Sequence, residues 1–171
     1  LSRKTLLPII NEMFKNNENL ARLKDKLPFE FHYFVGKTEL DLVLWAAARI
    51  EENRTAMLGV WNMDYDLTAI LAVLEKNNIP PEKVLSTSTL AAHHQTSRYA
   101  RDNKKTAHLT DKWHWNYSSG WTQWYDAMLL YAKHRVVKGK ESSYAADYIL
   151  KANGIAGKLH FDELEGVENL S

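Results

Sequence analysis

The feature that most constrains the fold is a short apolar run, Ala56–Trp61, between two segments whose apolar residues repeat with the period of a helix. The run is too short for a helix, which predicts a strand buried on both faces. Before it, Thr38 is placed to cap a helix that continues to Asn53. After it, Asp66 is placed to cap a second helix, which ends before Pro80.

A second strand is predicted at Phe29–Val35, which is short, aromatic and followed by Gly36. Residues 29–85 then have the order strand, helix, strand, helix, which favours an α/β (α+β) fold with a mixed sheet and flanking helices. A regular crossover would make the Ala56–Trp61 strand parallel to a neighbour. An amphipathic helix is predicted upstream, at Thr5–Asn17.

The polar segment Ser86–Lys105 predicts a long exposed loop. It is followed by two predicted strands, Thr106–Tyr117 and Gly120–Asp126, which we expect to pair as an inserted β-hairpin. Trp113, Trp115 and Tyr117 would alternate onto one face of that hairpin.

Two helices are predicted in the last third of the chain. The first runs from Asp126 to Lys133, and the second is capped by Ser143 and ends at Asn153, with Gly154 in the left-handed conformation. A short strand near Lys158–Phe161 would follow.

The length of 171 residues, with 45% apolar and 25% charged residues, predicts one domain of ordinary globular composition. We divide this single domain, 1–171, into an N-terminal helix and connection (1–28), a core (29–85), a basic loop with an aromatic hairpin (86–126) and C-terminal helices (127–171). The chain contains no cysteine, which excludes disulfides and thiolate metal sites. No apolar stretch is long enough to predict a membrane helix.

The net charge of +1 hides a basic segment, residues 98–140. Cations interleaved with aromatic rings suit a single-stranded nucleic acid, whose phosphates and bases they can contact. A solvated loop beside an aromatic hairpin gives the same composition, so both interpretations stay open. The DNA-binding candidates are Arg98, Arg101, Lys104, Lys105, Trp113, Trp115, Lys133, Arg135, Lys138 and Lys140.

Polar side chains appear where the Ala56–Trp61 strand ends. Ligands of open α/β sheets bind beyond the carboxyl ends of strands, so Asp66 is placed where a metal-binding carboxylate could lie. A helix cap at the same residue and a turn at Asn62 are the alternative, and the two roles are compatible.

The pattern Trp61-Asn62-x-x-Tyr65-Asp66 resembles the second exonuclease motif of family B DNA polymerases. Landmarks resembling the tailed-phage members follow in order over residues 29–164: Trp124-Tyr125-Asp126, Ser143-Tyr144-Ala145-Ala146-Asp147-Tyr148 and Gly157-Lys158-Leu159. The resemblance implies a ribonuclease H-like domain that removes mispaired nucleotides from single-stranded 3′ ends with two Mg²⁺ or Mn²⁺ ions. It further implies that Asp66 is a catalytic, metal-binding carboxylate and that Asn62, Tyr65 and Trp61 contact the terminal nucleotide.

The chain departs from that family in lacking an Asp-x-Glu first motif and the Tyr and Asp of the third motif. We therefore expect a partial ribonuclease H-like fold that binds no metal and cleaves no DNA by itself, although its parent polymerase would. Expected partners are single-stranded or primer-template DNA, the rest of the polymerase and, across truncation surfaces, a second copy. The expected location is the cytoplasm, that of the host if the gene is phage-borne.

Two alternatives are a non-catalytic α/β module that binds nucleic acid or a protein through its Trp-rich hairpin, and a degenerate exonuclease domain kept as a scaffold. The sequence flanking this chain would discriminate between them.

Overall fold

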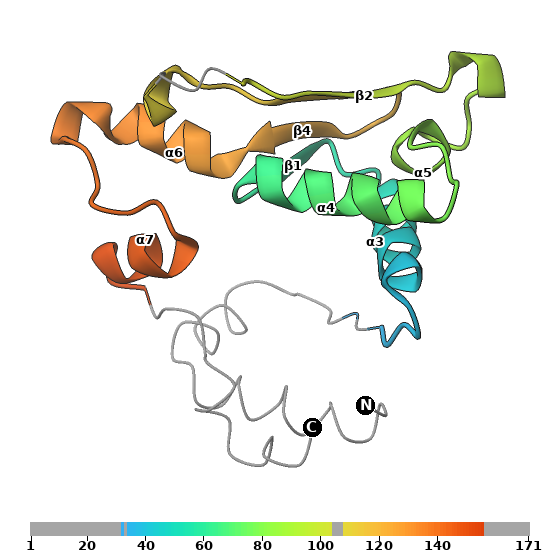
Figure 1. Cartoon of the computed structure of the whole chain (residues 1–171), viewed down its shortest axis with the longest axis horizontal. Helices are drawn as coiled ribbons and strands as arrows, with labels where there is room; N and C mark the ends of the chain where they lie inside the picture. The colour runs from blue at the N-terminus through green and yellow to red at the C-terminus, as the bar shows by residue number, and fades with distance from the viewer. Residues whose placement is uncertain (1–31, 33, 104–107, 156–171) are drawn as a thin grey trace, which may run out of the picture. The chain divides into compact units, whose positions relative to one another are not determined.

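The computed structural model describes residues 32, 34–103 and 108–155 (Figure 1). The chain divides into two compact units, Gly36–Ser142 and a second that is made of Leu1–Val35 with Ser143–Ser171. The helices, with one parallel and one antiparallel strand pair, confirm the α/β class. The predicted helix at Thr5–Asn17 and strand near Lys158–Phe161 lie outside the described residues.

The unit Gly36–Ser142 contains most of the described elements, and α7 belongs to the second unit. In chain order they are α3 (Glu39–Glu52), β1 (Met57–Val60), α4 (Met63–Lys76), α5 (Glu82–Leu85), a 3₁₀ turn (Ala92–His94), β2 (Ser97–Ala100), a 3₁₀ turn (Leu109–Asp111), β3 (Trp115–Ser118), β4 (Gln123–Asp126), α6 (Ala127–Arg135), a 3₁₀ turn (Val136–Lys138) and α7 (Ala146–Ala152).

Helix α3 begins at the cap that the sequence predicts. The backbone N–H of Asp41 donates to the Thr38 hydroxyl over 3.2 Å, and the N–H of Thr38 donates to the Asp41 carboxylate over 2.9 Å. This reciprocal capping box satisfies two N–H groups that the first helical turn would otherwise leave open. Asn53 caps the other end, so both predicted ends of the helix are confirmed.

Strand β1 is confirmed, but the prediction that it is buried on both faces is wrong. Leu58 and Val60 pack against the core, whereas Met57 and Gly59 are exposed. Among the described residues, the sheet containing β1 has two strands, β1 and β4. His32, Phe34 and Val35, the described part of the predicted Phe29–Val35 strand, form no strand.

The parallel pairing of β1 is confirmed, with β4 as its neighbour and Leu58 opposite Trp124. The predicted hairpin is wrong, because β3 pairs with β2 in antiparallel orientation instead. The residue between the expected strands explains the difference. The Ser119 carbonyl accepts from the Thr87 N–H, and its N–H donates to the Thr96 carbonyl, so the turn is tied to the segment that precedes β2.

The predicted exposed loop Ser86–Lys105 is therefore wrong in two places. It contains β2, and its first two residues are buried. The Glu51 carboxylate at the end of α3 holds the beginning of the Ser86–Lys105 segment in place. It accepts from the Thr87 hydroxyl and from both the N–H and the hydroxyl of Ser88.

The core of the unit forms where α4 packs over β1 and β4. Met63 and Leu67 of α4 are fully buried with Trp124 of β4, and Leu58, Ile50 and Leu71 among others pack around them. Gly59 lies opposite Tyr125, and a Cβ atom at Gly59 would come within 2.6 Å of the Tyr125 ring. A side chain at that position would force the ring to move.

A single buried carboxylate, that of Asp126, joins the two helices that begin at the carboxyl ends of the parallel strands. Its Oδ1 accepts from the Leu129 N–H of α6 over 3.0 Å, and its Oδ2 accepts from the Met63 N–H of α4 over 3.1 Å. Asn62 precedes α4 in the left-handed conformation and gives no side-chain cap. The prediction that Asp66 caps α4 is wrong, because Asp126 supplies the oxygen and Asp66 lies within the first turn.

Helix α7 begins later than predicted. Ala145 precedes it without a side-chain cap, and the Ser143 hydroxyl accepts from the Ala145 N–H instead, so the prediction of a Ser143 cap is wrong. Gly154 adopts the predicted left-handed conformation, with φ +71°. No helix in the described part of the chain has the length and apolar character to span a bilayer.

We predict that Asp126→Ala lowers the free energy of unfolding by roughly 2–4 kcal/mol, because two helix N-termini lose their acceptor at once. Urea unfolding followed by circular dichroism measures the change. Asp111→Ala, at an exposed aspartate, should stay within about 0.5 kcal/mol of the wild type. Equal effects of the two substitutions would contradict the double cap.

Candidate functional site

A groove of about 460 Å³ lies beside the carboxyl end of β1, along one face of α4. This is the end of a parallel strand pair at which ligands of α/β sheets bind. The residues that line it recur at helical spacing on α4 and are joined by one from the end of β2: Asn62, Asp64, Tyr65, Thr68, Ala69, Ala72 and Arg101. Its volume lies within the range of small-ligand pockets.

Two of the predicted substrate-binding residues, Asn62 and Tyr65, line the groove together. Asn62 has φ 63°, a conformation that asparagine tolerates better than most residues, and it turns the chain from β1 into α4. The Tyr65 ring is 73% exposed and offers a flat surface at the groove. The third, Trp61, does not line the groove and packs against Tyr131 of α6 with 5.9 Å between ring centroids.

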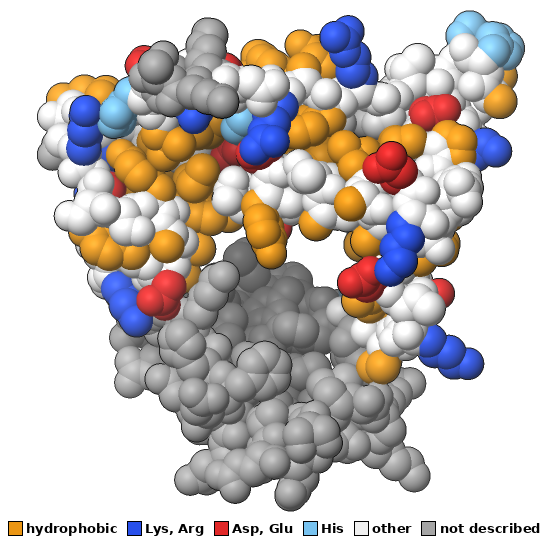
Figure 2. Space-filling model, viewed as in Figure 1, with side chains coloured by type: hydrophobic (Ala, Val, Ile, Leu, Met, Phe, Trp, Pro, Cys, Tyr) orange, Lys and Arg blue, Asp and Glu red, His pale blue; other side chains and the backbone are white. Residues whose placement is uncertain are grey.

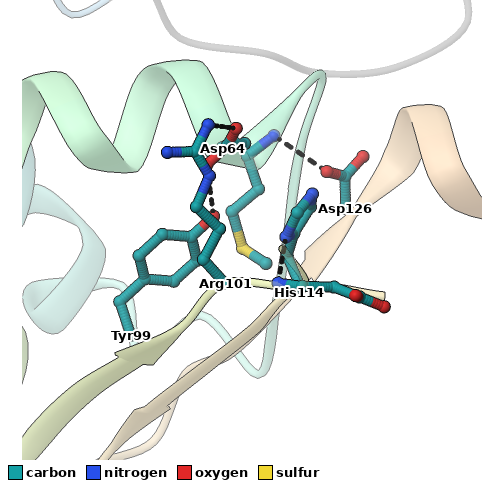
Figure 3. A network of polar contacts seen from close by, with 7 residues as sticks. Asp64, Tyr99, Arg101, His114 and Asp126 are labelled. Carbon is teal, nitrogen blue, oxygen red and sulfur yellow. Dashed lines mark hydrogen bonds and ion pairs between the residues drawn. The ribbon is translucent and has the colours of Figure 1, made fainter. Parts of the chain in front are cut away.

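The Asp64 carboxylate, on the wall of the groove, joins helix α4 to Tyr99 of strand β2 and to Arg101, which follows β2 (Figure 3). Its Oδ1 accepts from the Tyr99 hydroxyl over 3.0 Å, and its Oδ2 accepts from Arg101 Nη2 over 2.6 Å. Burial and the bond to Asp64 raise the pKa of Tyr99 well above its usual value, so its hydroxyl remains a donor at neutral pH. Sequence reasoning missed Asp64 because its partners lie more than thirty residues away.

Asp66, the predicted catalytic carboxylate, lies in the first turn of α4 and is partly exposed. It does not line the groove, and its side chain bonds no other residue in the described part of the chain. The described residues contain no group of three or more histidine, cysteine or acidic side chains that could hold a metal ion. Asp66 alone does not fit a two-metal centre, so a metal role would need carboxylates from other segments.

His114, the residue before β3, lies beside Asp126 (Figure 3). Its ring is buried, and its Nδ1 accepts from the Asp102 N–H over 3.1 Å, which places the proton of the neutral ring on Nε2. Burial raises the pKa of Asp126, opposed by the N–H groups of Leu129 and Met63 that favour the ionised form.

The basic candidates do not form one uniform patch. Arg101 is paired with Asp64, and Arg135 is paired with Glu141 over 3.0 Å. Arg98 and Lys140 are exposed. Lys133 lies with its Nζ 5.4 Å from the Trp113 ring centroid. Lys104, Lys105 and the Lys138 side chain lie outside the described residues.

The predicted alternation of the aromatic residues is confirmed. The ring centroids of Trp113 and Trp115 are 5.5 Å apart, and those of Trp115 and Tyr117 are 6.0 Å apart with nearly parallel planes. His93, His94 and His108 do not share a site. The rings of His93 and His94 contact each other, while His108 bonds Thr110.

No family model, curated protein or solved structure matches this chain.

We predict that the stability contributed by Asp126 falls as the pH rises. Burial raises its folded pKa above the ordinary value of about 3.9, so the folded chain binds this proton more tightly than the unfolded chain. The benefit is complete below the ordinary pKa and is lost as the pH passes the folded pKa. Urea unfolding of wild type and Asp126→Asn between pH 3 and pH 7 isolates this group, because asparagine does not titrate. The wild type should lose stability relative to the variant as the pH rises, and the opposite slope would show that the two N–H bonds outweigh burial.

Proposed function

We propose that this chain is part of the proofreading 3′–5′ exonuclease domain of a phage-like family B DNA-directed DNA polymerase, and that its groove receives the single-stranded 3′ end. The observation that carries the proposal is the meeting of Asn62 and Tyr65 in one groove at the end of a parallel strand. These are motif positions that the family resemblance assigns to the terminal nucleotide.

The groove has the chemistry that a nucleotide requires. Tyr65 offers an exposed ring on which a base can stack, and Asn62 offers both a donor and an acceptor. Arg101 places a guanidinium cation on the wall of the groove, and this side chain remains partly exposed although it is bonded to Asp64. A phosphate entering the groove would compete with Asp64 for that guanidinium, which is suited to bidentate phosphate binding.

The metal chemistry of the proposed parent would come from Mg²⁺ or Mn²⁺ held by carboxylates from three motifs, and Asp66 is the only one of them that the resemblance places in this chain. The residues of this chain would then bind and orient the 3′ end, and the partners would be primer-template DNA and the rest of the polymerase in the cytoplasm. The alternative is a non-catalytic α/β module that uses the same groove for binding alone.

The decisive experiment uses a polypeptide extended by its natural flanking sequence. We expect Mg²⁺-dependent digestion of single-stranded DNA from the 3′ end, and we expect Asp66→Ala to reduce it at least 100-fold, because a metal-binding carboxylate is lost. Glu75→Ala, at an exposed acid on the same helix, serves as the matched control and should digest normally. Normal digestion after Asp66→Ala would remove the assigned role, and flanks without the first and third motifs would favour the non-catalytic module.

The groove makes a separate prediction for the 171-residue chain. Tyr65→Ala should weaken binding of a linear oligonucleotide with a free 3′ end roughly 5-fold or more, because a stacking ring is lost, while Tyr65→Phe should retain most of the affinity. Binding of circular single-stranded DNA should not change in either variant. Fluorescence anisotropy in EDTA measures both, and an equal loss on circular DNA would contradict a site for 3′ ends.

A further inference from the structure

The outward face of the β2–β3 pair carries aromatic and basic side chains together. Residues directly opposite each other in an antiparallel pair project to the same face. Arg98 lies opposite Tyr117, and Ala100 lies opposite Trp115, so these four residues share one face. The Trp115 and Tyr117 side chains are 44% and 54% exposed, whereas Tyr99 and Asn116 face inward.

The rings on this face form one continuous row. Trp113 extends the row from Trp115 and Tyr117, and both neighbouring pairs are in ring contact. Lys133 stands over Trp113 at one end of the row and also donates to the Thr110 carbonyl, which holds it in place. Arg98 stands at the other end, opposite Tyr117. A cation therefore lies beside each end of the row.

We propose that this surface, which we call the aromatic face (Arg98, Trp113, Trp115, Tyr117 and Lys133), is a binding site for single-stranded nucleic acid. Bases stack on the exposed rings of Trp115 and Tyr117, Trp113 extends the row under Lys133, and the two cations contact phosphates. The site goes beyond the proposed exonuclease function, because it requires neither a metal ion nor a 3′ end, and it lies on the opposite face of β2 from the groove.

The cations on this face, and the contacts that already fix its aromatic rings, favour a nucleic acid over a protein partner. A single-stranded nucleic acid supplies both groups that this face suits, flat bases for the exposed rings and phosphate anions for the cation beside each end of the row. Figure 2 shows that hydrophobic side chains and Lys or Arg side chains lie next to one another on the viewed side of the molecule. The rings are already in contact with one another, so stacking bases on them orders few additional side chains.

The test measures binding of a fluorescent circular single-stranded DNA to the 171-residue chain in EDTA. Trp115→Ala should weaken binding roughly 5- to 100-fold, the range for loss of a base-stacking ring. Trp115→Phe should restore most of the affinity. Trp121→Ala is the matched control. Trp121 is 54% exposed, compared with 44% for Trp115, and the Arg54 guanidinium lies over its ring, but it is not part of the aromatic row. Circular dichroism and urea unfolding of each variant establish that the fold is kept.

A second readout concerns the cations. Arg98→Ala should reduce the slope of log affinity against log salt by about 1, whereas Lys83→Ala, at an exposed lysine of α5, should leave it unchanged. Single-stranded DNA and RNA of the same sequence should both bind, since base faces and phosphates are common to them. The proposal is overturned if neither binds, as expected for a protein-binding face, or if Trp121→Ala weakens binding as much as Trp115→Ala.

The outcomes separate this site from the groove. Loss of circular DNA binding in Trp115→Ala together with unchanged binding in Tyr65→Ala supports the aromatic face whatever the extended polypeptide does to DNA. Absence of digestion by the extended polypeptide would overturn the proposed exonuclease alone.

Discussion

The buried carboxylate of Asp126 is the interaction on which the arrangement of the larger unit depends. Its two oxygens cap two helices, and it sits at the end of the strand that pairs with β1. Asn62 contributes no side-chain cap, so α4 starts where the Met63 N–H meets an oxygen from a residue more than sixty positions away. Burying a carboxylate costs free energy, and N–H groups at the positive ends of two helix dipoles offset part of this cost, since burial still raises the pKa of Asp126.

This junction also places the groove. The parallel register sets Val60 opposite Asp126, so both strands end at the same edge of the sheet. The chain then turns at Asn62, and the first turn of α4 presents Asp64 and Tyr65 beside the end of β2. The Asp64 bonds to Tyr99 and Arg101 join the parallel pair to the antiparallel pair, which share no backbone ladder.

Local sequence signals predicted local structure well. The Thr38 cap of α3 and the end of α4 at Asn77 depend on residues three or four positions apart, which a sequence shows directly. Strand partners, the α4 cap and the Asp64 network depend on residues 15 to 66 positions apart. A turn such as Ser118–Gly120 favours a hairpin by its composition, and only the bonds of Ser119 to Thr87 and Thr96 redirect β3 to β2. The carboxylate expected at the site, Asp66, and the one that contacts the groove, Asp64, differ by two positions on one helix turn, a distinction that spacing could not make.

The groove and the aromatic face are set by one strand register. Along β2 the side chains alternate, so Arg98 faces the aromatic row while Tyr99 and then Arg101 face Asp64. Along β3 the same alternation sends Trp115 and Tyr117 outward and His114 and Asn116 into the core. A shift of β2 by one residue would bury Arg98 where Tyr99 bonds Asp64, and a shift of β3 by one residue would turn Trp115 and Tyr117 inward. The inward bonds of Tyr99 and Arg101 therefore also keep Arg98 on the outward face, beside the aromatic rings of β3.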